Sequence, residues 1–281
     1  MKRIPSIAMA REPVPFASDL IRHRSLLWQF TLRNVEIRHK GSHLGLVWSV
    51  LNPVLMLGCY VVVFGFIFGG KFGVLPNETK VDYALGIFFG LSLFQLVAEV
   101  LGVSPAIIVT NPNFVKKVVF PLEILPAAAV GGALFHMLIS LSLVLLGVAI
   151  FGNGLDFGAL WLPVFVAPLV LLTLGLSWFI SALGVFFRDI GQLMQFVIMV
   201  LMYASAVFFS SDRIQQTALT AWKILRFNPL LLAIELSRDA VLWHRPVNFR
   251  YLAYLYISSL LACYLGHLAF RRMKPAFADV L

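Results

Sequence analysis

The sequence predicts an all-α integral membrane protein with six transmembrane helices, and two observations support this prediction. Of 281 residues, 60% are hydrophobic and only 12% are charged, about half the charged fraction of an average globular chain. With a mean hydropathy of +0.90, too little polar surface remains to cover the core of a soluble enzyme. In addition, six apolar runs are long enough to cross about 30 Å of hydrocarbon.

The apolar runs define the domain organisation. They extend over residues 44–68, 83–109, 122–151, 160–187, 193–209 and 251–270. We therefore predict a transmembrane domain at 44–270, a cytoplasmic segment at 1–43 and a cytoplasmic tail at 271–281. The first run begins too late for a cleaved secretory signal, so the N-terminal segment is expected to be retained.

Lys and Arg near the ends of the runs predict the orientation. Residues 1–43 contain eight, the 111–120 loop two and the 271–281 tail three, and an excess of these residues marks short cytoplasmic segments. Both termini are therefore expected in the cytoplasm. The 210–250 segment is external by parity although it contains six basic residues, because long loops obey the rule weakly.

Two irregular segments flank this pattern. Before the first run, apolar and basic residues alternate with a roughly helical period, which predicts an amphipathic helix in the membrane interface; a solvated basic helix is the alternative. Before the last run, 218–227 and 230–242 are each too short to span and are separated by Asn228 and Pro229. These residues predict a re-entrant helical hairpin within 211–250, with an external loop resting on the bilayer as the alternative.

The motifs of common enzymes are missing. The six histidines do not occur at metal-ligand spacing, and no GxSxG motif is present. Gly65, Gly70 and Lys71 match part of a phosphate-binding loop, but Phe72 replaces its hydroxyl residue. We therefore expect no catalytic residue, no metal site and no nucleotide site in this chain. Lys and Arg form no stripe with stacking aromatics, so no nucleic-acid partner is expected.

Glu99 is the carboxylate placed deepest in an apolar run. It lies four residues after Gln95, hence on the same helical face, where a charge is costly unless it faces protein or water. Counting along the runs places His136 about 8 Å away along the membrane normal. Structural pairing or neutral protonation is therefore favoured over a proton relay.

Aromatic residues occur inside the apolar runs as well as at their ends. Tyr60, Phe64 and Phe68 share one face of the first predicted helix. The fifth run supplies Phe196, Tyr203, Phe208 and Phe209. Aromatic faces can stack on sugar rings, so these seven residues are candidates for lining a glycan channel; lipid-facing or core packing is the alternative.

Five segments resemble ABC-2 type permeases that export polysaccharides, such as the membrane subunits of O-antigen, teichoic acid and capsule exporters. The matching segments are 26–68, 111–126 (NPNFVKKVVFPLEILP), 186–192 (FFRDIGQ), 227–242 and 270–281 (FRRMKPAFADVL). They follow the family order, and the resemblance extends over nearly the whole chain, from residue 26 to residue 281. His39 departs from the pattern, which often has an aromatic residue or an Arg-Tyr pair before Lys-Gly-Ser.

The resemblance implies a permease subunit, without an ATPase site of its own, that moves a lipid-linked polysaccharide such as O-antigen across the cytoplasmic (inner) membrane. It also implies a homodimer with two copies of a separate ABC ATPase, which would hold the ATP and Mg²⁺; no cofactor is expected in this chain. An ABC-2 permease for drugs or small lipids, or a non-transport membrane protein of glycan assembly, remains the alternative.

The resemblance also implies that short cytoplasmic connections carry the coupling to the ATPase. The candidates for ATPase coupling are Asn111, Phe114, Lys116 and Lys117 in the first loop and Arg188 and Asp189 in the second. Charges that merely anchor helix ends are the alternative for both loops.

Overall fold

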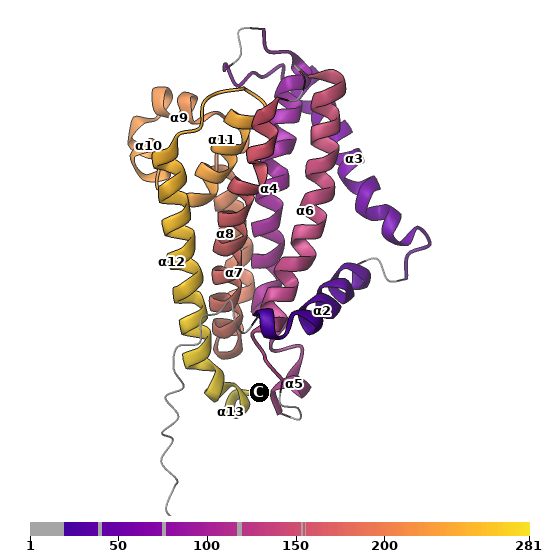
Figure 1. Ribbon diagram of the computed structural model, residues 1–281, viewed down its shortest axis with the longest axis vertical. Helices are drawn as coiled ribbons and strands as arrows, with labels where there is room; N and C mark the ends of the chain where they lie inside the picture. The colour runs from indigo at the N-terminus through magenta and orange to yellow at the C-terminus, as the bar shows by residue number, and fades with distance from the viewer. Residues whose placement is uncertain (1–19, 39–40, 75–76, 117–119, 153, 155) are drawn as a thin grey trace, which may run out of the picture.

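The computed structural model describes residues 20–38, 41–74, 77–116, 120–152, 154 and 156–281, and every regular element among them is helical (Figure 1). The main helices are α2 (Arg24–Ile37), α3 (Trp48–Tyr60), α4 (Lys80–Ile107), α5 (Pro112–Lys116), α6 (Ile124–Phe151), α7 (Leu162–Phe186), α8 (Ile190–Ala204), α9 (Ser211–Thr217), α10 (Leu219–Leu225), α11 (Pro229–Val241), α12 (Phe249–Met273) and α13 (Phe277–Val280). The all-α prediction is confirmed.

In this part of the chain, five helices are long and apolar enough to cross a membrane. They are Trp48–Ile67, Lys80–Ile107, Ile124–Phe151, Phe157–Phe186 and Phe249–Val280. The first continues α3 through a π-helical stretch, Val61–Ile67, and the fourth joins a 3₁₀ turn, Phe157–Trp161, to α7. The chain is therefore a multi-pass membrane protein.

The run predicted at 193–209 forms a shorter helix than expected. Helix α8 has 15 residues, or about 22 Å at the usual rise. It ends because the chain turns after Ala204, where Ala206 adopts a φ of 53°. An L-residue rarely adopts this conformation within a helix, so the aromatic pair Phe208 and Phe209 lies beyond α8.

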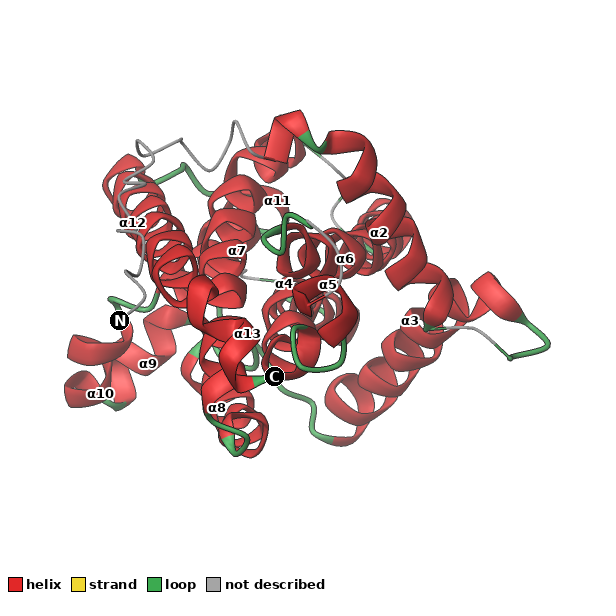
Figure 2. Ribbon diagram, turned by 90° about the horizontal axis from the view of Figure 1, so that it is seen from below, coloured by secondary structure: helices red, strands yellow, loops and turns green. Residues whose placement is uncertain are grey.

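Helix α4 forms the centre of the bundle, with α6, α7, α8 and α11 packed around it (Figure 2). Of its most apolar 18-residue stretch, 83% is buried, compared with 6% for the first span. Helix α3 therefore stands at the edge of the bundle and presents most of its apolar surface outward. On the opposite side α7 and α12 cross closely, since a Cβ on Gly266 would lie 2.0 Å from the carbonyl oxygen of Gly175.

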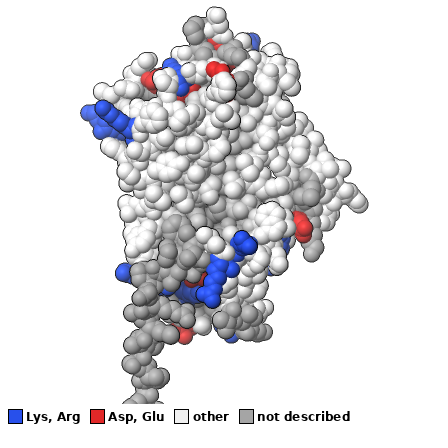
Figure 3. Space-filling view, viewed as in Figure 1, with Lys and Arg blue, Asp and Glu red and all other residues white. Residues whose placement is uncertain are grey.

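The charged side chains gather at the two ends of the bundle. On the face drawn in Figure 3, a wide band without Lys, Arg, Asp or Glu separates these ends. We name them the Lys80 end, where α4 begins, and the Asn111 end, where α4 leads into α5. An uncharged band of this kind is what the hydrocarbon layer requires.

The segment before α12 folds into three short helices at the Lys80 end. The break at Asn228 and Pro229 is confirmed: the Asn228 side chain accepts a hydrogen bond from the Leu230 amide at 3.0 Å and donates to the Ala204 carbonyl at 3.1 Å. The sequence predicted α10 and α11 but not α9. Nearly all of α11 is buried, including Glu235 and Arg238.

Arg238 holds the turn that follows α8. Its guanidinium is fully buried and donates to the carbonyl oxygens of Gly86 at 3.0 Å, Ala206 at 2.7 Å and Val207 at 2.5 Å. The Phe72 ring lies 4.8 Å from the guanidinium carbon. One side chain of α11 thus satisfies the two carbonyl groups of the turn and gives the Gly86 carbonyl of α4 a second donor.

Candidate functional site

A cluster of three ionisable residues joins α2, α4 and α6. The Arg38 guanidinium lies 2.6 Å from the Glu99 carboxylate, and the His136 Nδ1 lies 3.0 Å from the same carboxylate. Glu99 and His136 retain only 19% and 13% side-chain exposure. Pairing with a cation offsets the cost of placing a carboxylate inside an apolar bundle.

The structural pairing predicted for Glu99 is confirmed, and the 8 Å offset counted along the membrane normal does not keep its side chain from contacting His136. Both side chains are long enough to meet between adjacent helices, which a count of residues along two axes does not capture. Sequence reasoning also missed Arg38, which it assigned to the polar face of the amphipathic segment. A deep carboxylate without a cation within two turns of its own helix was the available signal for a partner elsewhere.

Two cavities meet at this cluster. A larger one of about 950 Å³ extends from Asn111 along α2, α4 and α8, and a smaller one of about 560 Å³ lies beneath α3. The residues that line both are Arg38, Gln95 and Glu99. Together the cavities form a hollow, mostly apolar but with polar side chains along its wall, that leads from the Asn111 end into the bundle. We call it the polar hollow below.

The structure brings five of the seven aromatic channel candidates into one ladder of ring contacts. Tyr60, Phe64 and Phe68 follow one another on α3 and its π-helical extension at 5.7 and 5.8 Å. Phe64 then contacts Phe208 at 5.6 Å, and Phe208 contacts Tyr203 at 6.1 Å. The ladder therefore joins the first span to α8 and to the turn after it.

The two remaining candidates lie apart from the ladder. Phe196 is 59% exposed on α8, and Phe209 lies against the Arg213 guanidinium at 5.8 Å. Of all seven, only Tyr60 lines the polar hollow, where Trp48 and Phe88 also lie. Spacing along one helix predicted the ladder on α3, whereas the crossing to Phe208 depends on the turn after α8.

The coupling candidates lie at the Asn111 end. Asn111 lines the larger cavity and donates from its side chain to the Ile107 carbonyl at 2.9 Å. Lys116 is exposed at the end of α5, and Arg188 and Asp189 are exposed in the turn between α7 and α8. Lys117 lies outside the described residues.

Phe114 is half-buried and packs against its own chain. Its ring stacks on Phe120 at 4.5 Å and meets Phe30 of α2 edge-on at 5.7 Å. The aromatic side chain thus connects the first loop to the N-terminal helix. Any partner at this loop would meet mainly the exposed residues of α5.

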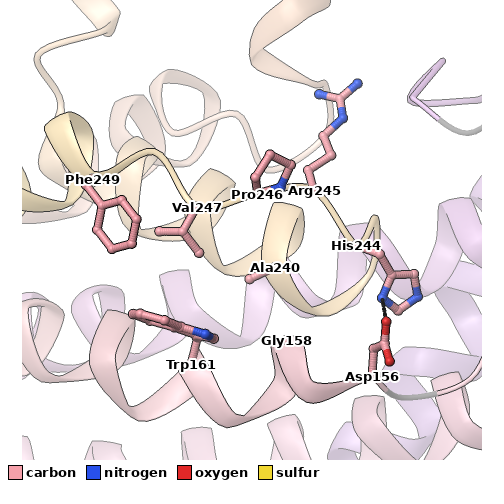
Figure 4. Close-up of a pocket in the computed structure, with 9 residues that line it drawn as sticks. All are labelled: Asp156, Gly158, Trp161, Ala240, His244, Arg245, Pro246, Val247 and Phe249. Carbon is pink, nitrogen blue, oxygen red and sulfur yellow. Dashed lines mark ion pairs between the residues drawn. The ribbon is translucent and has the colours of Figure 1, made fainter.

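A further cavity of about 410 Å³ lies at the Lys80 end, between the Phe157–Trp161 turn and the start of α12 (Figure 4). His244 Nδ1 pairs with the Asp156 carboxylate at 3.6 Å. The Trp161 and Phe249 rings meet edge-on at 6.0 Å. These contacts fasten the connection before α12 to the bundle, far along α4 from the polar hollow.

Helices long enough to cross a membrane, packed around a hollow that opens toward one end, define a multi-pass membrane protein. The chain belongs to the ABC-2 type transporter family, whose model matches residues 25–242.

Its relatives match over nearly the full length of both chains. The O-antigen export system permease protein RfbA of Klebsiella pneumoniae is 28% identical over 257 residues, which is 91% of this chain and 95% of the relative. RfbA of Myxococcus xanthus is 26% identical, covering 93% and 97% of the two chains. The polysialic acid transport protein KpsM of Escherichia coli is 24% identical, covering 87% and 92%.

Proposed function

We propose that this chain is the membrane-spanning permease subunit of an ATP-binding cassette exporter for a polysaccharide such as O-antigen. The observation that carries the proposal is the alignment with polysaccharide export proteins over about nine-tenths of both chains. The polar hollow supports it, since a hydroxyl-rich polymer needs hydrogen-bonding groups along an otherwise apolar path. The ring ladder adds stacking surfaces to that path.

Energy for transport comes from a separate ABC ATPase, which binds the ATP and Mg²⁺. Its two copies dock at the Asn111 end, against the exposed side of α5 and the turn at Arg188 and Asp189. ATP-driven closure shifts the permease between two conformational populations. The contact between Phe114 and Phe30 carries the movement of α5 to α2.

The permease forms a homodimer in the inner membrane, with both termini in the cytoplasm and a lipid-linked glycan between the protomers. Helix α8 is the sixth span, shortened by the re-entrant hairpin of α9 to α11 at the external side, and α2 lies in the cytoplasmic interface. The exposed apolar faces of α3 and α8 support this arrangement, because an edge helix that is only 6% buried needs a cover of lipid or a second protomer.

The orientation predicts which residues react from outside the cell. In intact cells, a cysteine replacing the exposed Asn77 is expected to react with a membrane-impermeant thiol reagent, whereas a cysteine replacing the exposed Asn113 is not. The native Cys59 is exposed and is replaced with Ser in both variants. Labelling of residue 113 but not of residue 77 would show that the orientation in the membrane is the reverse of the proposed one.

ATPase activity tests the function itself. We expect the chain to copurify with an ABC ATPase and, in lipid vesicles, a lipid-linked polysaccharide to raise the rate of ATP hydrolysis by the complex. Stimulation by drugs or small lipids, but not by polysaccharide, would instead indicate a small-molecule ABC-2 permease. Absence of any copurifying ATPase would favour a role in glycan assembly.

A further inference from the structure

Three side-chain amides face the polar hollow from three apolar helices. Asn52 of α3 lines the smaller cavity, Gln195 of α8 lines the larger one, and Gln95 of α4 lines both. All three residues are exposed. In the part of the chain that the structure describes, none of the three side chains has a hydrogen-bond partner. An amide in an apolar helix is costly unless water or a polar ligand satisfies it.

Gln95 is the most informative of the three. From Val81 to Gly102 it is the single exposed residue of α4, the most buried span. It lies 15 residues from the Lys80 start of α4 and 12 from the Ile107 end, or roughly 18 to 22 Å from each. The amide is therefore presented to the hollow near the middle of the membrane.

The charged groups of the hollow are largely committed to other contacts. Glu99 is paired with both Arg38 and His136, and the Arg33 guanidinium lies over the Phe30 ring at 5.6 Å. Around Asn52 and Gln95 in the smaller cavity, the hydrogen-bonding capacity outside this ion-paired cluster is uncharged, whereas Arg33 lines the larger cavity. Each amide offers two donors and an accepting oxygen.

This combination fits neutral sugars better than ions. A hydroxyl group both donates and accepts, which matches an amide, whereas a phosphate or carboxylate group only accepts and needs a free cation. Trp48 and Tyr60 line the smaller cavity beside Asn52 and Gln95. Ring faces beside a few placed polar groups are typical of a small-molecule site.

We propose that Asn52, Gln95 and Gln195 form a hydrogen-bonding subsite for neutral sugar units of the polymer, with Trp48 and Tyr60 as stacking surfaces. The subsite rests on the proposed export function and adds the chemistry of recognition: the units bound there are uncharged, and amides on three helices hold them in turn. Because each contact is weak, the polymer binds without becoming trapped.

Export by Leu variants in cells tests the subsite. Asn52→Leu, Gln95→Leu and Gln195→Leu are each expected to lower surface glycan per folded permease by roughly three- to tenfold, the value of one hydrogen bond of about 0.7 to 1.4 kcal/mol. Gln95→Asn, which keeps the amide, is expected to retain more export than Gln95→Leu. Gln215→Leu, an exposed amide on α9 outside the hollow, is the matched control and should export normally.

Protection of a cysteine from labelling measures directly whether the polysaccharide occupies the subsite. In a Cys59→Ser, Cys263→Ala background, Gln95→Cys is labelled with a maleimide in inverted membrane vesicles. Vesicles from cells that make the polysaccharide should react at least threefold more slowly than vesicles from cells blocked in its synthesis. A cysteine replacing Gln215 should show no such difference.

The outcomes separate the subsite from the export function. If the wild type exports and all three Leu variants export equally well, with Gln95→Cys labelled at equal rates in both kinds of vesicle, the subsite is wrong and the export function stands. Failure of the wild type itself to export would overturn the function. If Arg33→Gln abolishes the protection of the Gln95→Cys thiol from maleimide, while Gln95→Leu exports normally, the ligand is anionic. The subsite proposal is then overturned.

Discussion

Replacing Arg238 with Met is expected to remove most of the folded protein. The guanidinium supplies hydrogen bonds to three buried carbonyl oxygens, at Gly86, Ala206 and Val207. Each buried acceptor left without a donor costs about 1 to 3 kcal/mol, so the two turn carbonyls, Ala206 and Val207, together cost at least about 2 kcal/mol, and Gly86 loses its second donor. That is a large fraction of the stability of a typical protein.

Thermal unfolding in detergent, followed by size-exclusion chromatography, measures the effect. Arg238→Lys should also be strongly destabilised, because one ammonium group cannot reproduce the planar fork of the guanidinium. Arg245→Met is the matched control: Arg245 is 41% exposed and paired with Asp212 at 3.0 Å, and such surface pairs contribute about 0 to 1 kcal/mol. Equal melting temperatures for Arg238→Met and the wild type would show that the turn after α8 does not depend on this residue.

Replacing Phe114 with Ala is expected to separate ATP hydrolysis from export. The ring joins α5 to α2 through its contacts with Phe30 and Phe120, each worth roughly 0.5 to 1.5 kcal/mol. Losing both lowers the equilibrium constant for forming the joined state by about five- to 150-fold. Because α5 is a five-residue helix at the periphery of the bundle, the rest of the permease should stay folded.

The measurement is the ratio of polysaccharide exported to ATP hydrolysed, at equal amounts of folded complex. Phe114→Leu keeps apolar volume but not the ring. Its ratio of export to ATP hydrolysis should therefore lie between those of Phe114→Ala and the wild type. Phe157→Ala removes a ring that is 85% exposed at the other end of the bundle and should leave the ratio unchanged. A normal ratio and normal copurification of the ATPase with Phe114→Ala would remove this loop from the coupling mechanism.

Much of the fold could be predicted because it depends on local pattern. Long apolar runs marked five spans to within a few residues at most of their ends, since hydrocarbon thickness imposes a minimum length. The break between α10 and α11 was also predictable, because Asn228 and Pro229 act on the adjacent backbone. The pairing of Glu99 was foreseen from the cost of a charge in an apolar helix.

The remainder depends on contacts between distant segments. Arg38 meets Glu99 across 61 positions of sequence only because α2 packs against α6. The helix predicted at 193–209 ended early because Arg238, from a helix later in the chain, holds carbonyl groups of the turn after Ala204. Neither contact leaves a periodic signal in one sequence.

The sequence by itself determined that this is a membrane protein. It also determined the positions of the long helices along the chain and the family that the protein resembles. Those properties follow from hydrophobicity and local backbone chemistry, which act over a few residues. Only the tertiary structure decided which polar groups of those helices share a space: it joined Arg38, Glu99 and His136 and opened a hollow beside Gln95. The reason is geometric, because the direction of a side chain between two helices depends on how the helices cross, and that crossing is set by packing over the whole bundle.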